Sequence, residues 1–164
     1  MAKDIVNKPR ISKWIGWSYI GITISIAILY ISIGSLTDIR YSPLNLQMFL
    51  YVIMTFTFLL LAFTTLGLYN TKYAISDGVL SSWSPFVVIK LKIKDIKKVE
   101  RTMIPVHLRV GASLYCGFFY IPEVGWAKSI ITNLSDGLMI TDKSNKYYLI
   151  TPSNPERFKK LLKR

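Results

Sequence analysis

The side chains best suited to catalysis or metal binding are few in this 164-residue chain. His107 is its only histidine and Cys116 its only cysteine, whereas a metal site needs about three or four ligands within reach. The two could form a nucleophilic pair only if folding brought them together, and Cys116 lies in an apolar stretch while His107 follows Pro105 closely. The acidic residues occur singly, as they do in turns and caps. We therefore expect no catalytic residue, cofactor or metal, and a protein that is not an enzyme.

Positive charge is the chemistry that the chain does offer. Its 21 Lys and Arg residues against 9 Asp and Glu residues give a net charge of +12 at pH 7. Two clusters carry much of it, and the candidate contact residues are Lys90, Lys92, Lys94, Lys97, Lys98, Lys159 and Lys160, with Lys163 and Arg164 after them. Such surfaces either face solvent or contact an acidic protein partner or anionic lipid, where each Lys or Arg adds about 1 kcal/mol. Nucleic acid is not an expected partner, because no known reader motif accompanies the charge.

Two long apolar runs determine where this charge lies in the cell. Ile15–Leu36 and Leu46–Leu68 contain no charged residue, and about 20 apolar residues are enough for a helix to cross a bilayer. A cleaved signal peptide has a shorter apolar region, and a buried helix of a soluble protein rarely stays apolar on every face. The sequence therefore predicts a transmembrane hairpin over 14–69, with helices at about 14–36 and 46–68.

The charges that flank the hairpin predict its orientation. Residues 1–13 carry four Lys/Arg against one Asp, whereas the turn between the helices carries only Asp38 and Arg40. The segment after Leu68 carries sixteen Lys/Arg against seven Asp/Glu. Lys and Arg beside a span are retained on the cytoplasmic side. We expect a multi-pass protein of the cell membrane with both termini in the cytoplasm, and residues 1–13 as a flexible basic tether.

After the hairpin, the pattern is that of short strands. Asp77-Gly78 between apolar segments predicts a β-hairpin. Phe86–Lys94 alternates regularly, so the lysines at 90, 92 and 94 are expected on one face of a half-buried strand. Further segments rich in β-branched and aromatic residues bring the expected total to about seven antiparallel strands, enough for a small barrel.

The chain ends with an amphipathic helix. Asn154 is the expected N-cap and Pro155 the first helical residue. Phe158 lies on its apolar face and is expected in the core. A terminal helix of this kind can close one end of a small open barrel, so residues 70–164 are expected to form one domain.

Four sets of turn, cap and core residues follow a known pattern. They are Tyr73-x-Ile75-x-Asp77-Gly78, Ile93-x-x-x-Ile96-x-x-Val99-Glu100, Arg109-x-Gly111 with Gly117-x-Phe119, and Thr151-Pro152-x-Asn154-Pro155-x-x-Phe158. Together they resemble the bacterial pleckstrin-homology-like (PH-like) domain family, in the form that follows two N-terminal transmembrane helices. The resemblance implies a strongly bent barrel of seven strands with a C-terminal helix as its cap. A resemblance to this family indicates the fold more strongly than any particular function.

The expected fold is therefore that of an α+β membrane protein: a transmembrane helical hairpin, then a small antiparallel PH-like β-barrel capped by a C-terminal helix. We interpret the chain as a non-catalytic binding or scaffolding subunit of a larger membrane complex, whose partners are other membrane protein subunits. The alternative is a stand-alone sensor of anionic lipid headgroups. A third reading, an enzyme, requires a titratable cluster around His107 and Cys116.

Overall fold

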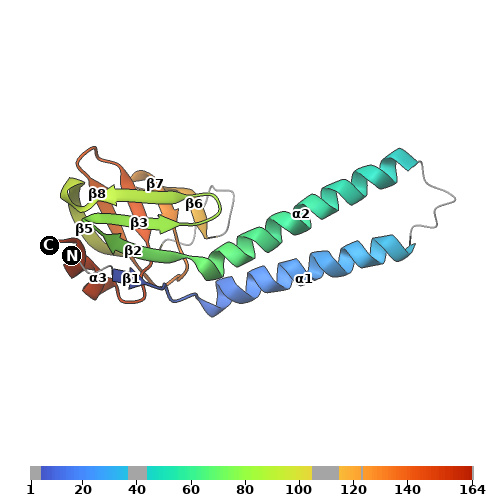
Figure 1. The fold of residues 1–164 in the computed structure, drawn as a ribbon, viewed down its shortest axis with the longest axis horizontal. Coiled ribbons are helices and arrows are strands. Elements are labelled where there is room, and N and C mark those ends of the chain that lie inside the picture. Colours follow the sequence, from blue (N-terminus) through green and yellow to red (C-terminus); the bar gives the residue numbers. More distant parts are fainter. Residues whose placement is uncertain (1–4, 37–43, 105–114, 123, 164) are drawn as a thin grey trace.

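The computed structural model describes residues 5–36, 44–104, 115–122 and 124–163, without the side chains of 5, 33–36 and 44–47. Two long helices, α1 (Lys13–Leu36) and α2 (Leu44–Asn70), run side by side and project from one end of a β domain (Figure 1). The expected hairpin of two long apolar helices is confirmed, and so are the β-sheets and the C-terminal helix that follow it.

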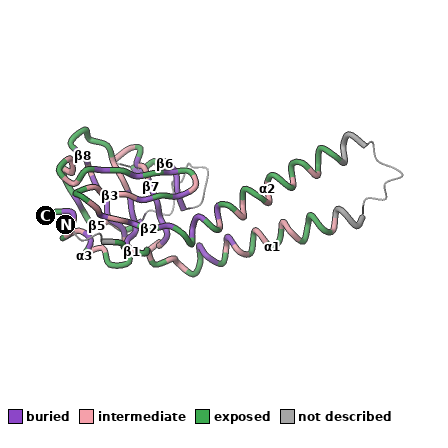
Figure 2. The backbone as a smooth tube through the Cα atoms, in the orientation of Figure 1, coloured by how far each residue is buried: buried purple, intermediate pink, exposed green. Residues whose placement is uncertain are grey.

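Both helices are long and apolar enough to cross a membrane, over Lys13–Ser32 and Met48–Asn70. Only 17% and 6% of the residues in their most apolar windows are buried, so these are not the core helices of a soluble domain, and Figure 2 shows their outer parts largely exposed. They contact each other through Thr23 and Thr65, whose Oγ1 atoms lie 3.3 Å apart. The two candidate spans indicate a membrane location.

The β domain consists of two sheets. The first has the strand order β1-β2-β3-β4 and is antiparallel throughout. The second has the order β5-β8-β9-β7-β6, and within it β7 and β9 pair in parallel. The strands are β1 (Ile5–Asn7), β2 (Lys72–Ser76), β3 (Val79–Trp83), β4 (Val88–Lys92), β5 (Ile96–Met103), β6 (Cys116–Ile121), β7 (Gly125–Ile130), β8 (Asp136–Asp142) and β9 (Tyr147–Ile150).

The β-hairpin predicted at Asp77-Gly78 is confirmed, because β2 and β3 pair around it and both residues have positive φ. The flexible tether expected at residues 1–13 is not what the described part of this segment shows. Ile5–Asn7 forms the edge strand β1, paired with β2. Residues 1–4 lie outside the described part of the chain. Three residues give no readable alternation, so this strand had no signal of its own in the sequence.

The C-terminal helix α3 (Pro155–Leu162) begins as the sequence predicts. The Asn154 side chain accepts a hydrogen bond from the Arg157 backbone N–H at 3.0 Å, and Pro155 occupies the first turn. Phe158 is 1% exposed and its ring meets that of Tyr73 edge to face, with centroids 6.2 Å apart. The predicted helix register is therefore confirmed.

The base of the helical hairpin shares one hydrophobic core with the β domain. Ile15, Tyr19 and Leu68 belong to the same buried cluster as the domain residues Tyr73 and Phe158. The purple segments where the helices meet the sheets show this junction in Figure 2. The β domain therefore packs directly against the helices and is not connected to them only by a flexible linker.

One residue in particular joins the second sheet to the hairpin. Tyr115, just before β6, donates a hydrogen bond to the Thr64 carbonyl oxygen at 3.1 Å. Its ring also meets that of Tyr19 edge to face, at 5.5 Å between centroids. The β6 edge therefore begins at the level of the first turns of α1 and the last turns of α2.

From this junction, the second sheet extends away from the hairpin. Figure 1 shows β6 and β7 toward the helices, and β5 and α3 at the opposite end of the domain. β5 and β6 are the two edges of this sheet, with β8, β9 and β7 between them. The domain therefore has a membrane-proximal end and a membrane-distal end.

Candidate functional site: a lysine-lined groove at the membrane-distal end

A groove of about 690 Å³ lies at the membrane-distal end, between the start of β5 and the end of α3. It is built by the 3-10 turn η1 (Ile93–Asp95), by β5 and by α3. Its apolar lining comes from Ile93, Ile96, Val99 and Leu162, and its polar lining from Lys94, Lys97, Lys98, Lys159, Lys163 and Glu100. Five cations thus surround a partly apolar floor.

The lysines of this groove are largely unneutralised by neighbouring acids. Lys98 pairs with Glu100, the only carboxylate in the lining, at 2.8 Å. Lys97 donates to the Asn145 side-chain oxygen at 3.0 Å. Within the described residues, no ion pair joins Lys94, Lys159 or Lys163 to a carboxylate.

The nearby acids of α3 and β8 are engaged elsewhere. Arg101 contacts Asp136 at 2.9 Å and Glu156 at 3.7 Å. The hydrogen bond and charge of Asp136 raise the pKa of the Arg101 guanidinium, so this cation stays charged. These ion pairs fasten the start of α3 beside β5 and leave the groove itself positive.

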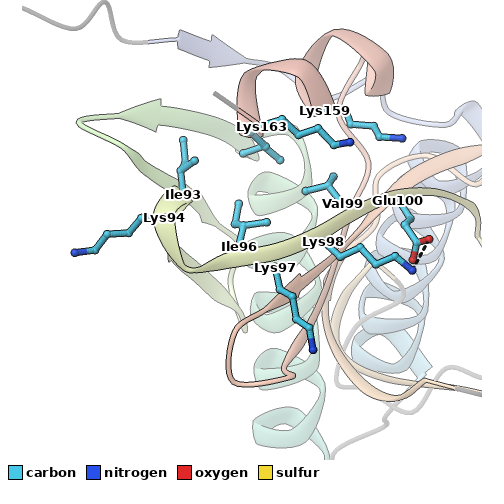
Figure 3. Close-up of a pocket in the computed structure, with 10 residues that line it drawn as sticks. Ile93, Lys94, Ile96, Lys97, Lys98, Val99, Glu100, Lys159 and Lys163 are labelled. Atoms are coloured by element: carbon cyan, nitrogen blue, oxygen red, sulfur yellow. Dashed lines mark ion pairs between the residues drawn. The ribbon is translucent and has the colours of Figure 1, made fainter.

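The ammonium groups do not converge on one point. Figure 3 shows Lys94 and Lys97 extending away from α3, whereas Lys159 and Lys163 project from the helix and Lys98 turns toward Glu100. A single phosphate is bound by donors aimed at one spot. Cations spread along a groove with an apolar floor suit an extended acidic chain better.

The two basic clusters of the sequence meet in this groove. Of the seven candidate residues, Lys94, Lys97, Lys98 and Lys159 line it, and Lys163 from the second cluster joins them. Lys160 is exposed and does not line it. Lys90 and Lys92 point outward from β4, on the exposed face of the first sheet.

The expectation that Lys90, Lys92 and Lys94 share one strand face is wrong for Lys94. β4 ends at Lys92, and the chain turns through η1 before β5 begins. The Ile93 backbone N–H donates to the Gly78 carbonyl at 2.7 Å, which holds this turn against the β2–β3 hairpin. The alternation of apolar and charged residues continues through this turn, but Lys94 belongs to the turn and lines the groove.

The structure describes only one of the two residues considered for catalysis. Cys116 is buried in the main core at the start of β6, and His107 lies outside the described residues. Among the residues that the structure describes, no group of three or more His, Cys, Asp or Glu side chains could hold a metal ion.

A stack of two sheets closed by a C-terminal helix, with a basic groove and two apolar helices before it, defines a PH-like domain attached to candidate membrane spans. The family described as bacterial PH domain matches residues 71–164. The chain belongs to this family. No curated protein and no solved structure was found to match the chain.

Proposed function

We propose that this chain is a non-catalytic membrane protein that binds an acidic segment of a partner subunit in the lysine groove. It would thereby act as a binding or scaffolding component of a larger membrane complex. The observation that carries the proposal is the groove itself, where five lysines from three elements surround an apolar floor and a single carboxylate. An acidic peptide with apolar residues would complement both features.

In the proposed orientation, the helices cross the cell membrane and both termini face the cytoplasm. The excess of Lys and Arg in residues 1–13 and after Leu68 supports this orientation. The fold is compatible with it, because β1 and α3 belong to the same domain at one end of the hairpin. The groove would then face cytoplasmic proteins.

The alternative, a sensor of anionic lipid, receives less support from the position of the groove. The groove lies beside β5, which three strands separate from β6, and β6 begins next to Thr64 of α2. The Debye length at physiological ionic strength is about 8 Å, so headgroups of the same membrane are largely screened from these lysines. An acidic partner approaching from the cytoplasm could contact these lysines directly.

The test compares two variants of the full-length protein that lose the same charge. In the groove variant, Lys94, Lys97 and Lys163 are changed to Gln. In the control variant, Lys90, Lys92 and Lys160 are changed to Gln, because these exposed lysines lie outside the groove. Each protein is purified in mild detergent, and both the co-purifying subunits and the binding of a polyglutamate peptide are measured.

We expect the parent and the control variant to bind polyglutamate and to retain the same stoichiometric partner, and the groove variant to lose both. Binding should weaken as salt rises, because it depends on charge. Equal losses in both variants would show that overall charge, and not the groove, is responsible. Retention of the partner by the groove variant would contradict the proposal.

A further inference from the structure

The loop between β3 and β4 rests directly on the second apolar helix. Pro85, in this loop, lies so close to Gly67 of α2 that a Cβ atom added at Gly67 would come within 2.2 Å of the proline ring. Gly67 lies three residues before Asn70, where the candidate span ends, and its neighbour Leu66 is 64% exposed. The loop therefore lies at the level where the candidate span ends.

This loop presents apolar side chains to the outside. Trp83, Phe86 and Val88 are 47%, 37% and 43% exposed, and Trp83 and Val88 are direct neighbours across β3 and β4. Exposed apolar side chains that lie together mark a contact site more often than single ones do. No Lys, Arg, Asp or Glu occurs between Gly78 and Ile89. Trp in particular is enriched where a protein meets the headgroup layer, because its ring is apolar and its N–H is polar.

The backbone of the loop is closed on itself. Ser84 and Val87 exchange hydrogen bonds through their main chains at 2.9 Å and 3.4 Å, and the Ser84 hydroxyl donates to the Val87 carbonyl at 2.9 Å. Pro85, between them, has no N–H to satisfy. These bonds leave fewer backbone polar groups of the loop in need of water, which lowers the cost of placing it in the headgroup layer.

From these observations we infer that the β3–β4 loop, Trp83 to Val88, is a third membrane contact of this protein. Its exposed Trp83, Phe86 and Val88 lie in the lipid headgroup layer beside α2. The inference depends on α1 and α2 spanning the membrane, but not on what the lysine groove binds. The loop would fix the tilt of the β domain against the bilayer and keep the groove directed away from it.

The test measures the depth of single tryptophans in the full-length protein, reconstituted in phosphatidylcholine–phosphatidylglycerol vesicles. The chain has tryptophans at positions 14, 17, 83 and 126. In the test variant Trp14, Trp17 and Trp126 are changed to Phe, which is mild because all three are exposed. Quenching is measured with lipids brominated near the headgroup end of the acyl chains.

Three further single-tryptophan variants complete the set, each with all other tryptophans changed to Phe. Phe86→Trp reports on the loop independently of Trp83. Phe56→Trp, at an exposed position in α2, reports on insertion of the span itself. Lys160→Trp, exposed on α3 at the membrane-distal end, is the water-exposed control.

We expect the brominated lipids to reduce the emission of Trp83 and of the Phe86→Trp variant several-fold more than that of Lys160→Trp. Their emission maxima should also lie at shorter wavelength. If the Phe56→Trp variant is quenched while both loop positions behave like Lys160→Trp, the inference is overturned and the spans stand. Blue-shifted loop emission without lipid quenching would point to a protein covering the loop, and would also overturn it.

Discussion

At the scale of single residues, Phe158 packs the C-terminal helix α3 into the core of the β domain. Its side chain is 1% exposed and lies against Tyr73. Truncating a buried Phe to Ala removes apolar contacts and leaves a cavity, so we expect Phe158→Ala to lower the free energy of unfolding by about 3–5 kcal/mol. Denaturant unfolding of the detergent-solubilised protein measures this loss.

The matched control for Phe158 is Lys160→Ala, an exposed change on the same helix that should cost within about 0.5 kcal/mol. If the Phe158→Ala protein unfolds at the same denaturant concentration as this control, α3 does not close the core.

Tyr73 places a hydroxyl in the centre of the same core. It donates to the Ile130 carbonyl at 2.8 Å and accepts from the Thr151 N–H at 3.2 Å. Burial raises the pKa of Tyr73 from 10.0 to about 12, because the charged phenolate would lose its hydration there. The folded state therefore favours the neutral phenol, and this contribution to stability is complete below pH 10 and lost as the pH rises through 12.

A shift of this size corresponds to about 3 kcal/mol. We expect Tyr73→Phe to lower stability at neutral pH by about 1–3 kcal/mol, since two buried polar groups lose their partner. Between pH 10 and 12, however, the variant should lose less stability than the parent. Unfolding curves of both proteins across this range test the point, and parallel declines would contradict it. Burial also raises the pKa of the Tyr115 hydroxyl. Because Tyr115 is present in both proteins, its contribution to the pH dependence is the same and does not affect the comparison.

At the scale of elements, the start of α3 depends on one cap. The Asn154 side chain satisfies the Arg157 N–H, which has no partner within the helix. We expect Asn154→Ala to cost about 1 kcal/mol and Asn154→Ser, which keeps a capping oxygen, to cost much less. Thermal unfolding of the two variants side by side measures the difference. Equal midpoints would mean that the cap contributes nothing and that the ion pairs of Arg101 hold the helix start.

The elements differ in how far their sequences reveal them. The two spans, the Asp77-Gly78 turn and α3 follow from local patterns, because an apolar run, a turn dipeptide or a capping residue specifies structure by itself. β1 does not, since three residues at an edge are ordered only by their pairing with β2. The end of β4 at Lys92 cannot be read from the sequence, because the alternation persists beyond it into the 3-10 turn η1.

The groove could be predicted only in part for the same reason. Each basic cluster is visible in the sequence, but Lys94 and Lys163 are brought together by the packing of α3 on the β5 end of the sheet. The apolar floor of the groove and the contact between Pro85 and Gly67 likewise join segments far apart in the chain. Local patterns carry no information about such contacts.

At the scale of the whole molecule, the helical hairpin and the β domain act as one body. Ile15, Tyr19 and Leu68 are buried in the same core as the β domain, which fixes the domain on the ends of the helices. The direction in which the groove faces is therefore set by the direction in which the hairpin is inserted. The groove can meet cytoplasmic partners only if the hairpin is inserted in the proposed orientation.

The most direct test of this orientation is the accessibility of single cysteines in intact cells. The native Cys116 is buried and is replaced by Ala to give a cysteine-free chain. Two single-cysteine variants are then treated with a membrane-impermeant thiol reagent. They are Ser42→Cys, in the segment of sequence between the two helices, and Ser144→Cys, at the exposed β8–β9 turn of the domain. We predict that the cysteine at position 42 reacts from outside the cell and that the one at position 144 reacts only after the membrane is opened. Labelling in the opposite sense would place the domain and its groove outside the cell and contradict the account.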